Sequence, residues 1–397
     1  LQFENKFSDA TQSNNFFPAV APNSGKTRMA GLLAKRTIDR QDVQQLIVAV
    51  PNTTVQDQWP EDVEEYGLVL SKKMDGKKLA RRGNLSKDIH GVVLTYAMIE
   101  SNKEILRKIV HDVPTGIILD EPHHLGTSKA WGDASREAFE YGKFYLLLSG
   151  TPFRPDENQI PFSDYSNGEL ELDFQYTLAD AIRDGISRPV EFMCTNGDVS
   201  WESDGHRFDV NFNNDLSKKD SAKRRRYALD YGKPFVKRML QKAYDQLTEI
   251  KSHHQQPNAK MLVIGMDKNH CDRLSIIIEE SLGFKPVVAP EGINNARQLI
   301  DDFKTSSEPI IIACNMISEG VNIKSARVLV YATNIVSPLS FEQIVGRICR
   351  KENTDQTGPG LVFMADDPEL REMAKRIEEM TKHGLKQLED RSSQEGP

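Results

Sequence analysis

The sequence of 397 residues has little cysteine, and its cysteines are not arranged as metal ligands. The four, Cys194, Cys271, Cys314 and Cys349, lie far apart, and no two of them form a Cys-x-x-Cys pair. This spacing argues against a zinc ribbon and is typical of free thiols in a reducing compartment. We therefore expect a cytoplasmic protein without structural disulfides.

Long apolar runs are also absent. No stretch of about 18 apolar residues occurs, so the sequence predicts no transmembrane helix and no membrane partner. The first residues do not have the pattern of a signal peptide. The chain begins with Leu1 rather than methionine, which leaves room for a longer natural chain.

Positive charge does not dominate. Lys and Arg number 51 against 58 Asp and Glu, which gives a net charge of −7. The molecule is therefore not a polycation that coats nucleic acid, although an acidic body can still carry a basic groove. Hydrophobic residues make up 38% and charged residues 27%, which excludes collagen-like, disordered and disulfide-scaffold classes. The length predicts two or three domains.

Short apolar runs alternate with helical patterns along most of the chain. Continuous apolar runs are typical of strands that are buried on both faces of a parallel sheet. We expect strands at 16–21, 46–50, 91–95, 116–119, 144–148, 261–264, 286–288, 310–313, 328–331 and 361–363. We expect helices at 26–39, 99–110, 268–282, 295–303 and 368–391. This alternation predicts an α/β fold with parallel sheets.

The alternation is interrupted once, at about residues 154–260. This stretch contains turn residues and aromatics, and then a charged helical pattern at 218–251. The sequence therefore predicts one α/β domain at 1–190 and another at 260–397. Residues 191–259 are expected to form a connecting segment or an extension of either domain.

A candidate phosphate loop, Pro22–Thr27, stands between an expected strand and an expected helix. Such a loop directs backbone N–H groups and the positive end of the helix toward a phosphate. Lys26 would reach the β- and γ-phosphates of a nucleotide, and the hydroxyl of Thr27 would bind Mg²⁺. Val20 stands where the full pattern has glycine, so a chance match is the alternative. The residues expected to contact the nucleotide are Asn23, Ser24, Gly25, Lys26 and Thr27.

A second candidate is the apolar strand that ends in Asp120 and Glu121. Both carboxylates would lie at the carboxyl edge of the sheet, where α/β proteins bind ligands. Asp120 would hold Mg²⁺, and Glu121 would orient or deprotonate an attacking water. A solvated turn is the alternative for an isolated pair of acids. His123 and His124 beside them could also bind zinc, but no further ligand is suitably spaced.

These residues resemble the motifs of superfamily 2 helicases. Asp120–His123 resembles the DExH box, and Ser149–Pro152 resembles the third motif. Gln343–Arg350 matches the sixth motif, Gln-x-x-Gly-Arg-x-x-Arg, at every fixed position. Further similarities are Ser318–Asn322 with the fifth motif, 46–51 and Gln58-Trp59 with motif Ia, and Thr95-Tyr96 with motif Ic. Within the superfamily, the sequence looks most like the branch of type III restriction subunits, UvrB and XPB.

The resemblance implies two RecA-like domains with ATP and Mg²⁺ in a cleft between them. The first domain would supply Lys26, Thr27, Asp120 and Glu121, and the second would supply Gln343, Arg347 and Arg350. Arginines suit the second role because guanidinium is always charged and binds oxygens bidentately. The implied nucleotide contacts also include Gly320 and, for adenine, Gln2. The implied coupling residues are His123, Ser149 and Thr151, and the implied nucleic-acid contacts are Thr95, Gln58, Arg154 and Ser318.

The expected function is an ATP-dependent helicase or translocase, with DNA favoured over RNA as its track. A nuclease or another subunit of a larger complex is an implied partner. The alternative is a nucleic-acid-binding scaffold subunit that uses ATP as a switch or not at all. Val20, Asn23 and Asn322 favour that alternative, because each departs from the usual motif residue; the fifth motif usually has Asp where Asn322 stands. Two basic clusters, Lys72–Lys87 and Lys218–Arg226, are either nucleic-acid contacts or solvated surface.

Overall fold

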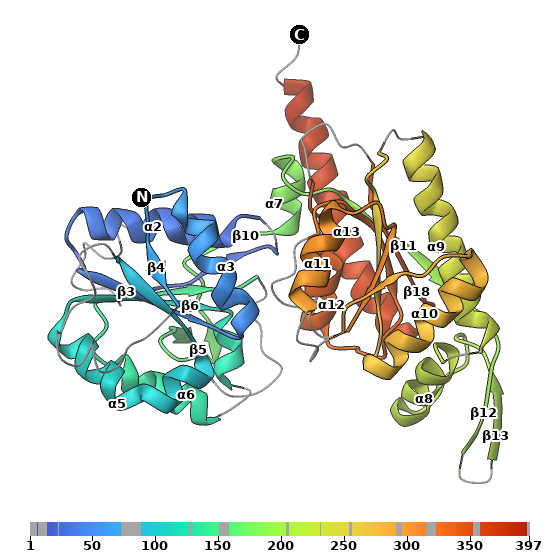
Figure 1. Ribbon diagram of the computed structural model, residues 1–397, viewed down its shortest axis with the longest axis horizontal. Coiled ribbons are helices and arrows are strands. Elements are labelled where there is room, and N and C mark those ends of the chain that lie inside the picture. Colours follow the sequence, from blue (N-terminus) through green and yellow to red (C-terminus); the bar gives the residue numbers. More distant parts are fainter. Residues whose placement is uncertain are drawn as a thin grey trace. The chain divides into compact units, whose positions relative to one another are not determined.

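The chain folds into two compact units, Leu1–Thr177 and Leu178–Pro397. Figure 1 shows them in a computed structural model. The structure describes residues 6, 14–22, 24–72, 89–126, 129–150, 159–203, 206–230, 232–253, 256–290, 296–314, 323–351 and 358–394. Each unit contains a six-stranded parallel sheet with helices packed on it, which confirms the predicted fold class. Among the described residues, no helix is both long and apolar enough to cross a membrane.

The main sheet of the first unit has the strand order β1-β7-β6-β3-β5-β4. Its strands are β1 Asn15–Phe16, β3 Gln45–Val50, β4 Leu70–Ser71, β5 Gly91–Thr95, β6 Thr115–Asp120 and β7 Phe144–Leu148. The helices are α2 Lys26–Asp39, α3 Thr53–Glu64, α5 Tyr96–Asp112, α6 Lys129–Ala138 and the 3₁₀ turn Pro122–Gly126. Short strands are β2 Pro18–Val20, β8 Tyr165–Ser166, β9 Glu169–Leu170 and β10 Phe174–Tyr176.

The central strand β3 shows why apolar runs form this sheet. Its side chains alternate between the two faces, so Leu46 and Val48 join one buried cluster while Ile47 and Ala49 join another. Helices α2 and α3 contribute to the first cluster, and α5 and α6 contribute to the second. Figure 1 shows these pairs of helices on opposite sides of the sheet. A strand buried on both faces needs apolar residues at every position, which explains the continuous run.

The strand predicted at 16–21 is in fact two short strands with different partners. β1 pairs with β7, whereas β2 pairs with β10, the last strand of the unit. The N–H of Val20 donates to the carbonyl of Ser149 at 3.0 Å, and the N–H of Ala21 donates to the carbonyl of Tyr176 at 2.8 Å. The residues that lead into the phosphate loop are therefore held by backbone hydrogen bonds on both sides.

The main sheet of the second unit has the strand order β11-β18-β17-β14-β16-β15. Its strands are β11 Val190–Thr195, β14 Lys260–Ile264, β15 Val287–Val288, β16 Ile310–Ala313, β17 Ala326–Tyr331 and β18 Gly360–Ala365. The helices are α7 Leu178–Arg183, α8 Lys218–Ala228, α9 Pro234–His253, α10 Lys268–Leu282, α11 Ala296–Thr305, α12 Pro338–Gly346 and α13 Pro368–Gln394. The hairpin strands are β12 Val199–Ser203 and β13 His206–Val210.

Residues 191–259, expected as a connecting segment, lie in the second unit. Strand β11 forms an edge of the main sheet through parallel pairing with β18. The charged pattern at 218–251 forms two helices, α8 and α9, rather than one. The strand pairing at β11 was not predicted, because its sequence, which includes Glu191 and Thr195, lacks the continuous apolar run of the inner strands.

The β12–β13 hairpin and α8 form an arm that extends from the second unit (Figure 1). Trp201 on β12 is buried and stacks on Phe208 of β13, with ring centroids 4.8 Å apart. Trp201 also stacks on Tyr227 of α8, with ring centroids 5.9 Å apart. The tryptophan therefore belongs to the packing of this hairpin–helix arm.

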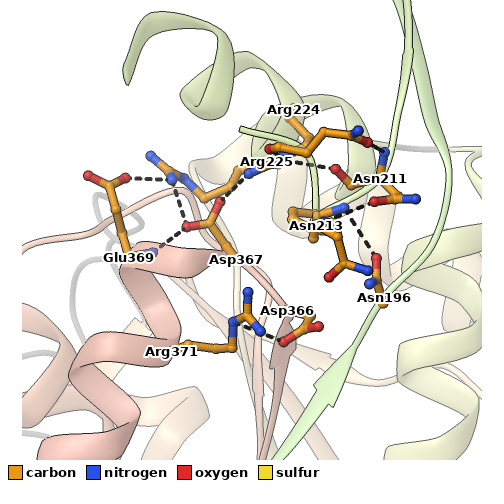
Figure 2. A network of polar contacts seen from close by, with 11 residues as sticks. Asn196, Asn211, Asn213, Arg224, Arg225, Asp366, Asp367, Glu369 and Arg371 are labelled. Atoms are coloured by element: carbon orange, nitrogen blue, oxygen red, sulfur yellow. Dashed lines mark hydrogen bonds and ion pairs between the residues drawn. The ribbon is translucent and has the colours of Figure 1, made fainter. Parts of the chain in front are cut away.

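A pair of buried arginines fastens the arm to the start of α13 (Figure 2). Arg225 contacts the Asp367 carboxylate at 3.0 Å and Glu369 at 2.7 Å. Arg224 contacts the other Asp367 oxygen at 3.5 Å and donates to the carbonyl of Asn211 at 2.8 Å. Two members of the basic cluster Lys218–Arg226 are therefore structural. Lys218, Lys219 and Arg226 are exposed.

We expect Asp367→Asn to loosen the arm strongly. The substitution leaves two buried guanidinium groups without their shared anion, and breaking a buried pair costs about 3–5 kcal/mol. Hydrogen exchange of the α8 amides measures this local opening free energy. Asp366→Asn is the matched control, because the Arg371–Asp366 pair at 3.3 Å is largely exposed on its arginine side. We expect a change of about 0–1 kcal/mol there, and equal effects of the two variants would contradict this interpretation.

Candidate active site

The candidate phosphate loop has a glycine in a left-handed conformation at the start of α2. Gly25 is the N-cap of α2 and has φ 90°, a left-handed conformation that residues with a Cβ rarely adopt. Among the described residues, no atom lies within 4 Å of a Cβ added to Gly25. The first turn of α2 contains no acidic residue. The buried hydroxyl of Ser24 has no hydrogen-bond partner among the described residues.

Lys26 joins this loop to the acidic end of β6. Its amine lies 3.0 Å from Asp120 Oδ1 and also hydrogen bonds to Glu121 Oε1. The sequence motifs that contain these three residues are separated by more than ninety positions. The structure therefore brings the predicted phosphate-binding lysine and both predicted acidic residues to one edge of the sheet.

Burial and mutual charge set the protonation of this cluster. Burial raises the pKa of the Asp120 carboxyl, and the Lys26 charge offsets only part of that effect. Burial also acts to raise the pKa of Glu121, but the charges of Lys26 and His123 outweigh it and lower that pKa to about 2. Burial acts to lower the pKa of Lys26, and the two carboxylates reverse this effect and raise it. Glu121 is therefore an anion at neutral pH.

Two further predicted residues, Ser149 and His123, contact Glu121. The hydroxyl of Ser149 donates to Glu121 Oε2 at 3.1 Å, and His123 Nδ1 lies 3.4 Å from the same oxygen. Ser149 follows β7, and the N–H of Glu121 donates to the carbonyl of Leu148 at 2.8 Å. Glu121 has φ 50°, a conformation that costs free energy in a residue other than glycine. The strained turn directs the carboxylate toward Lys26 instead of solvent.

Asp120 is held from both faces of the sheet. The indole N–H of Trp59 on α3 donates to Asp120 Oδ2 at 2.9 Å. The hydroxyl of Tyr96 at the start of α5 donates to the Asp120 carbonyl at 2.7 Å. Trp59 packs in the cluster on one face and Tyr96 in the cluster on the other. Sequence analysis had placed both residues in motifs but had given neither a role at Asp120.

The candidate nucleic-acid residues of the first unit immediately precede these two aromatics. Gln58 is half-buried on α3, one residue before Trp59. Thr95 precedes Tyr96 and caps α5, because its hydroxyl accepts from the N–H of Met98 at 3.3 Å. Gln56 donates to the carbonyl of Val93 at 2.8 Å and so ties α3 to β5.

The candidate arginines of the second unit lie at the end of α12. Gln343 and Arg347, four residues apart, share one side of the helix, and both are half-buried. Phe341 and Ile344 of the same helix pack in the core. Buried Arg188 donates from Nη2 to the carbonyl of Arg350 at 2.7 Å and fixes the backbone there. Sequence analysis missed Arg188, because no motif contains it.

Several predicted site residues lie outside the described residues. These are Gln2, Asn23, Thr151, Arg154, Ser318 and Gly320. Most of the basic cluster Lys72–Lys87 also lies outside them. The structure therefore brings together Lys26, Asp120, Glu121, His123 and Ser149 in the first unit.

Two family models match the chain, one in each unit. The model described as type III restriction enzyme, res subunit, matches residues 2–154, and the helicase conserved C-terminal domain matches residues 241–352. These two matches to helicase-family domains confirm the predicted resemblance to superfamily 2 helicases. The units of the chain are the two RecA-like domains that the motifs predicted, and its domains are those of ATP-hydrolysing enzymes.

This helicase-family chain is similar to longer proteins as well. An uncharacterized protein of Mycobacterium tuberculosis is 31% identical over 381 residues, which cover 94% of the chain and 62% of the relative. The type ISP restriction-modification enzyme LlaBIII bound to DNA aligns with a TM-score of 0.58 and 13% identity, over 97% of this chain and 29% of that one. Saccharomyces cerevisiae Dbp5 bound to RNA and ADP BeF3 aligns with a TM-score of 0.55 and 14% identity, over 97% of this chain and 93% of that one.

We expect Gly25→Ala to weaken nucleotide binding and to lower stability by about 1–2 kcal/mol, because alanine is strained at this positive φ. Gly283→Ala is the matched control, since Gly283 ends α10 at φ 79° and an added Cβ there also meets no atom of the described residues within 4 Å. Thermal unfolding should show a similar loss of stability for both variants. Titration with a fluorescent ATP analogue should show a loss for Gly25→Ala alone, and equal nucleotide affinity in the two variants would contradict the loop assignment.

Proposed function

We propose that the chain is an ATP-dependent DNA helicase or translocase that hydrolyses ATP to ADP and phosphate. The observation that carries this proposal is the Lys26 amine beside Asp120 and Glu121, next to the left-handed Gly25 at the N-terminus of α2. Residues 24–27 would hold the phosphates of ATP through backbone N–H groups and the Lys26 charge.

The residues present fit a nucleotide with Mg²⁺. The buried Ser24 hydroxyl, which has no partner among the described residues, is a suitable contact for a phosphate oxygen or the ion. Hydroxyl and carboxylate oxygens are the ligands that Mg²⁺ prefers, so Thr27 and Asp120 would hold it. When bound, the ion neutralises charge on the phosphate oxygens.

Glu121 is the proposed general base. Its carboxylate is ionised, and Lys26 and Ser149 fix its two oxygens in separate directions. A base held in this way can accept a proton from a water that attacks the γ-phosphate. His123 and Ser149, which contact the same carboxylate, are proposed to link this site to the nucleic acid. Gln343, Arg347 and Arg350 are proposed to stabilise the charge that develops during phosphoryl transfer.

DNA is the proposed track, and restriction-type relatives support it over RNA. The res-subunit family model covers the first unit, and LlaBIII is described as bound to DNA. Thr95, Gln58, Arg154 and Ser318 are the proposed backbone contacts. Such contacts position the protein without reading sequence and depend on salt. A nuclease or another subunit of a larger complex remains the proposed partner.

The test is ATP turnover at fixed low salt, first without nucleic acid and then with single-stranded DNA, duplex DNA or RNA. We expect DNA to stimulate turnover and Lys26→Ala to abolish the stimulated rate. Stimulation by RNA alone would overturn the choice of track. Binding of a polymer without turnover by the folded wild-type chain would favour the scaffold alternative instead.

We expect Glu121→Gln to separate binding from hydrolysis. The amide has nearly the same shape as the carboxylate but cannot accept a proton, so turnover should fall by about a hundredfold or more. ATP affinity should remain close to that of the wild type, because the loop and Lys26 are unchanged. A coupled phosphate-release assay and equilibrium nucleotide titration measure the two quantities. Full turnover in the folded variant would exclude Glu121 as the base.

A further inference from the structure

We propose that Trp59 and Tyr96 are positioning residues that couple nucleic-acid binding to the nucleotide site through Asp120. This inference rests on the proposed function, because it assigns a route between the two proposed ligands. Each residue donates one hydrogen bond to Asp120, and each directly follows a proposed nucleic-acid contact, Gln58 or Thr95. A proposed nucleic-acid contact followed by an aromatic residue that holds Asp120 thus occurs twice, once on α3 and once at the start of α5.

The two hydrogen bonds hold different parts of Asp120. Trp59 holds the side chain through Oδ2, and Tyr96 holds the backbone through the carbonyl oxygen. All three residues are nearly or fully buried, with exposed fractions of 4% for Asp120, 1% for Trp59 and 0% for Tyr96. Water cannot readily replace either donor there, so the loss of one leaves a buried oxygen unsatisfied. The position of the carboxylate therefore depends on both aromatics.

The two aromatics are also packed tightly with their own elements. Trp59 lies in the middle of α3, where its ring packs in one apolar cluster. Tyr96 is the first residue of α5 and packs in the other cluster. The elements are joined by Gln56, which donates to the carbonyl of Val93 at 2.8 Å and lies 3.5 Å from the sulfur of Met98. A restraint on either α3 or α5 would therefore affect the position of Asp120.

A physical consequence follows for the two ligands. A phosphate backbone that binds at Gln58 and Thr95 restrains the middle of α3 and the start of α5, and Trp59 and Tyr96 are restrained with them. Asp120 is then held more firmly in the place where it meets the nucleotide with its ion. By linkage, the nucleotide strengthens nucleic-acid binding by the same factor. Allosteric factors of this kind are about 5- to 150-fold.

The experiment measures this coupling factor at equilibrium, without turnover. The probes are a fluorescein-labelled DNA duplex and ADP–beryllium fluoride with Mg²⁺. The Kd of the duplex is measured by anisotropy with and without the nucleotide. The Kd of the nucleotide is then measured with and without the duplex. The two ratios must agree in any one variant, which provides an internal check.

Tyr96→Phe is the decisive variant, because it removes one hydroxyl and keeps the ring. Tyr145→Phe is its matched control: Tyr145 is also buried in the first unit, and its hydroxyl also donates to a backbone carbonyl, that of Phe139 at 2.6 Å. We expect the coupling factor to fall about threefold or more in Tyr96→Phe, the equivalent of one net hydrogen bond, and to stay unchanged in Tyr145→Phe. Trp59→Phe should reduce it as well.

Each outcome decides a different claim. An unchanged coupling factor in folded Tyr96→Phe and Trp59→Phe would overturn the inference and leave the proposed function intact. An equal fall in Tyr145→Phe would assign the effect to general stability of the unit and would also overturn it. Failure of the wild-type chain to bind the duplex, single-stranded DNA or RNA would overturn the proposed function, and with it the inference.

Discussion

A partly buried lysine amine beside the buried carboxylate of Asp120 and the partly buried carboxylate of Glu121 is the constraint on which the first unit depends. Lys26, Asp120 and Glu121 would each be costly to bury alone, since an unpaired charge in the interior is strongly disfavoured. Together they fix the phosphate loop against the end of β6 and keep Glu121 ionised. The same contacts that make the cluster stable therefore leave it charged and ordered at the edge of the sheet, where a nucleotide binds in α/β folds.

The second unit uses buried charge for a different purpose. Arg224 and Arg225 do not face a proposed ligand but join the hairpin–helix arm to Asp367 at the start of α13. Arg188 likewise holds the backbone at Arg350. Buried ion pairs add little net stability compared with apolar packing, and their value lies in fixing one arrangement. In this unit, Arg224 and Arg225 fix the position of the arm, and Arg188 fixes the backbone at the candidate residue Arg350.

Local sequence patterns were sufficient wherever a strand or helix was uniform. The strands at 91–95, 144–148 and 310–313 and the helices at 26–39 and 268–282 have the predicted bounds. Prediction was poorer where neighbours from distant parts of the chain decide the structure. Strand β11 needs β18 as a partner, and the strand expected at 16–21 divides because β7 and β10 each pair with part of it.

The sequence by itself determined the α/β class and the resemblance to superfamily 2, and it predicted Lys26, Asp120 and Glu121 as site residues, because these follow from short motifs and local periodicity. Only the tertiary structure decided that Trp59 and Tyr96 hold Asp120, and that Arg224 and Arg225 are buried rather than part of a basic surface. The physical reason is the same in both cases. A hydrogen bond or ion pair between residues tens of positions apart depends on which faces of the sheet the helices cover, and no local pattern specifies that.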